Sequence, residues 1–190
     1  MLKGVVLGFV LAVIILVGGL YSYFAMGMAP VATADPPMPF ERKLAHMALD
    51  ALIEKQHIDH PPVPADEPNY LAGAEVYKQH CAMCHGLPGQ SPTDYATTMY
   101  PKPPQLFRGK GVTDDPVGES YWKTANGIRL TGMPGFKTKL TDTQIWQVSQ
   151  LLAHANEIPD SVKAALVLEA ASSTSTNAPH RPGAPNPMPK

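Results

Sequence analysis

An apolar run at the N-terminus sets the first constraint on how this chain can fold. From Gly4 to about Met28 no side chain is charged, and Val5–Phe24 is long enough to cross the hydrocarbon core of a bilayer as a helix. We therefore predict that residues 1–28 form a transmembrane anchor. A second interpretation stays open, because Ala32-Thr33-Ala34 provides an A-x-A site at which a secretory signal can be cleaved.

Charge near the apolar run predicts its orientation. Lys3 is the only side-chain cation before Arg42, and the positive-inside rule places that end in the cytoplasm. We expect a single pass through the cytoplasmic membrane, with the rest of the chain on the periplasmic side. Cleavage of a signal would export the same residues.

The remaining residues divide by composition into three parts. Residues 29–68 are rich in proline and form a spacer, in which residues 40–56 have helical periodicity and residues 57–68 form a Pro-rich linker. Residues 69–156 are predicted to be the folded domain. Residues 157–190 are expected to hold a short helix and a Ser/Thr/Pro-rich disordered tail. The apolar positions of the 40–56 helix are Leu44, Met47, Ala48, Ala51, Leu52 and Ile53.

Overall charge excludes one class of partner. The formal net charge is -1, and no basic stripe runs along the chain. We therefore expect no nucleic-acid partner.

The only two cysteines lie in Cys81-Ala82-Met83-Cys84-His85, which has the C-x-x-C-H form of c-type haem attachment. Two thiols on one helical turn can add to the two vinyl groups of a porphyrin, and the following imidazole can bind the iron. Two alternatives fit this sequence less well. A redox dithiol is typical of a βαβ setting, which this sequence does not predict. A structural zinc site needs a second pair of ligands, and the sequence has no other cysteine.

The residues around this motif resemble the class I cytochrome c family. Gly73, Tyr77 and Cys81 give G-x-x-x-Y-x-x-x-C-x-x-C-H on a helix that we expect to start near Tyr70. The resemblance covers 69–156 and implies an all-α, cytochrome c-like domain carrying one covalent haem c. Gly73 would allow close approach of a second helix at 141–155, with Thr141 as its N-cap.

A sixth ligand to the iron is predicted in a loop near the end of the domain. Gly132-Met133-Pro134 resembles the family's methionine loop, so we expect Met133 to bind the iron opposite His85. Met99 and an open site remain as alternatives.

Four further residues are predicted to lie around the haem. Pro103-Pro104-Gln105-Leu106 resembles the family's G-P-x-L segment, with Pro103 in place of glycine. By that match the Pro104 carbonyl would accept a hydrogen bond from His85, and Leu106 would line the haem pocket. Trp122 and Arg129 have N–H donors that suit haem propionates.

These expectations predict a membrane-tethered monohaem cytochrome that transfers single electrons and is not itself an enzyme. The resemblance implies redox partners such as a quinol-oxidising complex and a terminal oxidase or dehydrogenase. The alternatives are a haem subunit of a larger oxidoreductase and, less favoured, an open-site haem enzyme or gas sensor. Five cations on the loops expected near the haem edge can form a weak docking patch for partners, with a merely solvated surface as the alternative: Lys102, Arg108, Lys110, Lys137 and Lys139.

Overall fold

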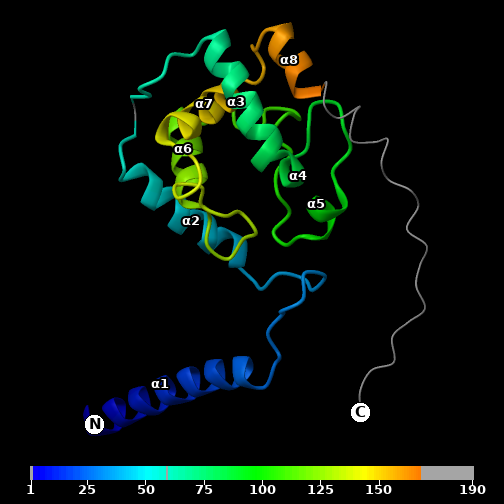
Figure 1. The fold of residues 1–190 in the computed structure, drawn as a ribbon. Helices are drawn as coiled ribbons and strands as arrows, with labels where there is room; N and C mark the ends of the chain where they lie inside the picture. The colour runs from blue at the N-terminus through cyan, green and yellow to red at the C-terminus, as the bar shows by residue number, and fades with distance from the viewer. Residues whose placement is uncertain (1, 59, 168–190) are drawn as a thin grey trace, which may run out of the picture. The chain divides into compact units, whose positions relative to one another are not determined.

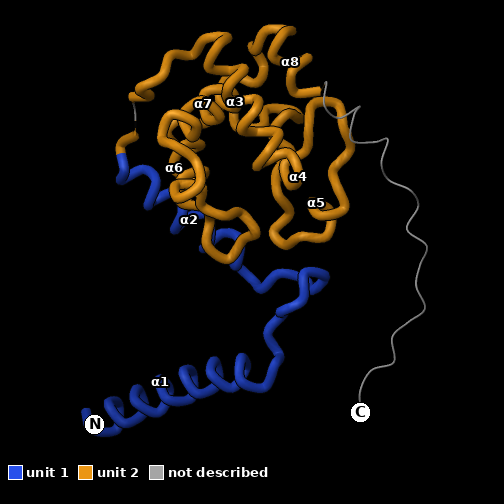
Figure 2. The backbone as a smooth tube through the Cα atoms, in the orientation of Figure 1, with its two compact units in different colours: residues 1–56 blue, residues 57–190 orange. Residues whose placement is uncertain are grey.

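The computed structural model describes residues 2–58 and 60–167, which contain eight α-helices and no strand (Figure 1). The predicted all-α class is therefore confirmed. The chain forms two compact units, residues 1–56 and 57–190 (Figure 2). The predicted disordered tail lies outside the described residues.

The first unit consists of two helices and the segment between them. Helix α1, Leu2–Ala25, is long and apolar enough to span a membrane, judged by length and composition. It ends in a Schellman motif: Gly27 has a φ of 68°, and the amides of Gly27 and Met28 donate to the carbonyls of Phe24 and Tyr23. Helix α2, Glu41–Glu54, follows where the periodicity predicted one.

The proline-rich spacer between α1 and α2 contains hydrogen-bonded turns. The carboxylate of Asp35 accepts hydrogen bonds from the amides of Val31 and Ala32, at 3.0 and 2.9 Å. Glu41 accepts one from the amide of Met38 at 2.9 Å. Acidic side chains thus fold the proline-rich segment into local turns.

The described part of the second unit contains six helices, and the first of them starts earlier than expected. Helix α3 runs over Glu67–His80, whereas the sequence placed its start near Tyr70. Asp66 caps it by accepting from the amide of Asn69, and Pro68 lies in the first turn. Proline is tolerated there because the first amides of a helix have no intrahelical acceptor. The other helices are α4 Ala82–His85, α5 Asp94–Thr98, α6 Val117–Asn126, α7 Asp142–Ala153 and α8 Asp160–Val167.

The close packing of α3 on α7 confirms the role predicted for Gly73. A Cβ at Gly73 would lie only 2.4 Å from the carbonyl oxygen of Gln147, so the two backbones meet at this position. Thr141 and Gln144 form the expected capping box at the start of α7. Tyr77 is fully buried beside the crossing.

The packed unit extends on both sides of the expected 69–156 range. Helix α8 packs on α3 and buries Val162 and Leu166 in the common core. On the N-terminal side, the Gln150 amide donates to the carbonyl of Val63 at 3.0 Å. The proline-rich residues before α3 are therefore tied to the same core.

Candidate functional site

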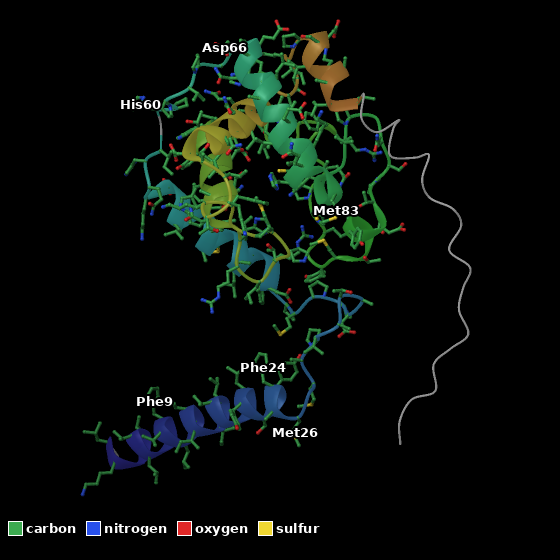
Figure 3. All side chains as sticks on the ribbon, viewed as in Figure 1. Phe9, Phe24, Met26, His60, Asp66 and Met83 are labelled. Carbon is green, nitrogen blue, oxygen red and sulfur yellow. The ribbon has the colours of Figure 1, made fainter. Side chains whose placement is uncertain are left out.

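The Cys81–His85 motif forms a single helical turn directly after α3. The amide of Cys81 donates to Tyr77, and the amides of Cys84 and His85 both donate to the Cys81 carbonyl. Both cysteines are free thiols and half-buried. Met83, which lies between them, is exposed on α4 (Figure 3). The two thiols and the imidazole therefore lie on one turn.

Hydrogen bonds from Tyr77, His85 and Gln105 help to hold this turn in place. The buried Tyr77 hydroxyl donates to the carbonyl of Gly86 at 2.7 Å. His85 Nδ1 lies 2.8 Å from the Pro104 carbonyl oxygen, which is the contact that the resemblance implied. The Gln105 amide donates to the Cys84 carbonyl at 3.3 Å. With Nδ1 engaged by a carbonyl, Nε2 is the ring nitrogen that can bind a metal.

Burial shifts the pKa values of two groups in this turn. It raises the pKa of the Cys81 thiol to about 12, with the neighbouring Cys84 as a second cause. Burial lowers the pKa of His85, and the hydrogen bond with Pro104 opposes that shift. A redox dithiol needs a lowered thiol pKa, so the first shift argues against a thioredoxin-like site. The second favours neutral imidazole, the form that binds a metal.

Met133 lies in a loop that is fixed to the end of α6. The amides of Phe136 and Lys137 donate to the carbonyls of Thr124 and Ala125, at 3.0 and 3.1 Å. A Cβ at Gly127 would lie 2.8 Å from the Met133 carbonyl oxygen, so only glycine fits there. The loop that carries the predicted thioether ligand, residues 127–136, therefore has a defined backbone path.

Met99, the alternative ligand, lies against the same loop. A Cβ at Gly132 would be 2.0 Å from the terminal methyl group of Met99. The Met99 side chain thus lies against the residue that precedes Met133, although 34 positions separate the two methionines in the sequence. The choice of Met133 rests on the sequence resemblance and stays a prediction.

The other predicted residues lie in different environments. Leu106 is buried in the core cluster, and Pro104 is exposed. Trp122 is half-buried on α6, and Arg129 is exposed in the loop of Met133. Their roles toward a haem stay predictions.

The residues considered for a docking patch are all exposed, but two of them have partners within the domain. Lys110 pairs with Asp114, and Arg108 donates to the carbonyl of Gln90. The patch is made up of Lys102, Arg108, Lys110, Lys137 and Lys139.

The donor set suits a porphyrin-bound iron better than a metal held by protein ligands alone. Within residues 2–58 and 60–167, no three His, Cys, Asp or Glu side chains form a metal-binding group. The motif instead offers two thiols and one imidazole on one turn, and a thioether loop lies in the same unit. Cys81 and Ala82 of the motif pack against the hydrophobic core cluster, and so do five half-buried apolar or aromatic side chains: Leu87, Phe107, Val112, Tyr121 and Phe136.

Sequence reasoning missed several contacts that shape this site. Helices α5 and α6 were not predicted, and neither was the stacking of Tyr121 on Trp146, with ring centroids 4.1 Å apart. The hydroxyl of Thr93, which caps α5, also donates to the Met83 carbonyl at 2.6 Å. Thr93-Asp94 is a recognisable N-cap signal, so α5 had a signature in the sequence.

Comparison with known proteins supports a haem-binding domain. Residues 68–152 match the protein family described as cytochrome C oxidase, cbb3-type, subunit III. The matched segment runs from the first turn of α3 to the last turn of α7 and includes the Cys81–His85 motif and Met133. No curated protein and no solved structure gave a match.

Proposed function

Residues 68–152 form a c-type cytochrome domain, and from this premise we propose that the chain is a membrane-tethered monohaem electron carrier. Cys81 and Cys84 hold the haem through two thioether bonds, and His85 and Met133 bind its iron. The anchor is α1, and the domain lies on the periplasmic side of the cytoplasmic membrane. The observation that carries this proposal is the single turn with two thiols and a His85 imidazole oriented by Pro104.

Each group in the site has a defined task. The bound haem supplies a one-electron iron couple. The Pro104 carbonyl holds the His85 ring through Nδ1, so that Nε2 is the ring nitrogen that would bind the iron. The hydrogen bonds from Tyr77 and Gln105 hold the attachment turn still, which limits the rearrangement that accompanies each electron transfer. The thioether of Met133 would be the second protein ligand to the iron and would exclude oxygen from it.

Two measurements test this proposal. Mass spectrometry of the peptide containing residues 81–85 should show the added mass of one haem, and replacing both Cys81 and Cys84 by Ala should abolish it. Redox titration of the full chain in detergent should follow a one-electron curve. A non-covalent haem, or a stable disulfide between the two cysteines, would contradict the proposed attachment.

A second candidate function is a haem subunit of a membrane oxidase. The observation that favours it is the matched family, whose description names an oxidase subunit. Co-purification from native membranes in mild detergent separates the candidates. A stoichiometric complex with other redox subunits would favour the oxidase subunit, and a free chain would favour the carrier.

A further inference from the structure

The segment that carries Met133 is a closed loop with its own hydrogen bonds. The amide of Ile128 donates to the Met133 carbonyl at 3.2 Å, so the two ends of residues 128–133 are joined. Within the loop, the Thr131 hydroxyl donates to the Ile128 carbonyl at 2.7 Å and accepts from the Met133 amide at 3.1 Å. We expect these six residues to move as one piece, so that a contact on any of them acts on Met133.

Gly132 leaves a gap in this loop, and the Met99 side chain fills it. A Cβ at residue 132 would overlap the terminal methyl group of Met99 and lie 3.6 Å from its sulfur. The φ of Gly132 is not in the left-handed region, so the backbone conformation does not require glycine there. The space taken by the half-buried Met99 side chain does require it.

Met99 directly follows α5, and the other end of α5 is fixed to the attachment turn. The amide of Met99 donates to the carbonyl of Tyr95 at 3.1 Å. Ahead of the helix, the Thr93 hydroxyl accepts from the Ala96 amide at 3.2 Å and donates to the Met83 carbonyl at 2.6 Å. That carbonyl belongs to the last turn of α4, where carbonyls have no donor within the helix. Helices α4 and α5 accordingly lie side by side (Figure 1).

We propose that Met99 is a positioning residue for Met133, and that α5 connects the attachment turn to the loop of residues 128–133. The contacts run from the turn through Thr93 to α5, and from Met99 to Gly132. The inference rests on the proposed function, because it takes Met133 as the iron ligand. Met99 then acts on the iron only through the loop, by keeping the Met133 thioether in place when the charge of the iron changes.

A methionine suits this task because its side chain is apolar, unbranched and able to fill an irregular gap. The task depends on the volume of the side chain and not on its sulfur. Leucine has a similar volume and no thioether, so it should replace Met99 as a positioning residue. It could not replace Met99 as a ligand to iron.

The test uses the full, haem-loaded chain in detergent, oxidised, with imidazole added as a competitor of Met133 for the iron. In Met99→Ala the affinity for imidazole should rise about tenfold, because loss of a half-buried methionine side chain weakens the hold on the loop. The far-red sulfur-to-iron band should weaken in the same variant. Met99→Leu should keep the affinity and the band of the unmodified chain.

The other end of α5 provides a second pair of variants. Thr93→Val removes the hydroxyl that bonds to the attachment turn, and it should raise the affinity for imidazole as Met99→Ala does. Thr93→Ser keeps that hydroxyl and should leave the affinity unchanged.

Two controls separate positioning from a general loss of stability. Tyr95→Ala removes a larger side chain from the same helix, but one that is 63% exposed. Thr141→Ala removes the capping box of α7 and lowers stability away from the loop. Neither control should change the affinity for imidazole, and an equal rise in both would refute the positioning role.

The remaining results distinguish failure of this inference from failure of the proposed function. Unchanged imidazole affinity in Met99→Ala, with the band lost in Met133→Ala, would refute the positioning role and leave the electron carrier standing. Loss of the band in Met99→Leu and its retention in Met133→Ala would make Met99 the ligand, which overturns the positioning role and the choice of Met133. Absence of the band from the unmodified chain would contradict the proposed carrier itself.

Discussion

Gly73→Ala should destabilise the cytochrome domain, although alanine is the better helix former. In an unpacked helix this change would stabilise by about 1 kcal/mol. Here the new Cβ would lie 2.4 Å from the carbonyl oxygen and 2.8 Å from the carbonyl carbon of Gln147. Ordinary contact requires about 3.5 Å, so α3 and α7 would have to separate by about 1 Å.

The expected magnitude follows from the rigidity of the contact. Overpacking a core costs about 1–3 kcal/mol, and a clash between two backbones belongs at the upper end, about 3 kcal/mol. After subtracting the gain in helix propensity, the free energy of unfolding should fall by about 2 kcal/mol. Separation of the helices would also loosen the buried contacts of Ala74, Tyr77, Val148 and Leu151.

The assay is urea unfolding of the haem-loaded chain followed by far-ultraviolet circular dichroism. The matched control compares Gln79→Ala with Gln79→Gly, because Gln79 is exposed on the same helix. The free energy of unfolding of Gln79→Ala should exceed that of Gln79→Gly by up to about 1 kcal/mol. Unchanged or higher stability of Gly73→Ala would refute the close approach of α3 and α7.

Three further predictions concern a cap, a phenol and a loop. Thr141→Ala removes the capping box of α7 and should lower the free energy of unfolding by about 1 kcal/mol in urea, whereas Thr138→Ala, on the exposed segment before it, should not. The Tyr121 hydroxyl donates a hydrogen bond to Asp142, and this bond together with burial raises the pKa of Tyr121 to about 12. The stabilisation that the neutral phenol provides should therefore be present below about pH 10 and lost as the pH rises through about 12. Tyr121→Phe should reduce this alkaline loss in urea midpoints, and an identical pH dependence would exclude the assignment. Gly132→Ala places a methyl group 2.0 Å from Met99 and should weaken the far-red sulfur-to-iron band, with recovery when Met99→Ala is added. Additive losses in the double variant would show that the two residues are not in contact.

Features with local causes could be predicted from the sequence. The capping box at Thr141, the helical turn of the Cys81–His85 motif and the helix pairing through Gly73 all depend on residues at fixed spacings. Each of these patterns has one physical interpretation. A glycine at position 73, for example, indicates a place where two helix backbones meet. The all-α class and the resemblance to c-type cytochromes followed from these patterns.

Features with non-local causes could not be predicted. The contact of Met99 with Gly132 depends on how two loops fold back, and no periodicity encodes it. Helix α8 joins the core through Val162 and Leu166. These residues are buried because α8 packs on α3, which is far away in the sequence. The early start of α3 was missed because Pro68 was treated as the end of a linker, whereas Asp66 caps the helix ahead of it.

The most direct test of the proposed electron carrier is the optical spectrum of the full chain, oxidised and reduced, with and without carbon monoxide, compared with Met133→Ala. The account predicts a low-spin spectrum with the far-red sulfur-to-iron band, no response to carbon monoxide, and loss of that band in Met133→Ala. A high-spin spectrum that shifts with carbon monoxide in the unmodified protein would contradict it. The sixth position would then be open, and the site would be one for ligand binding or catalysis.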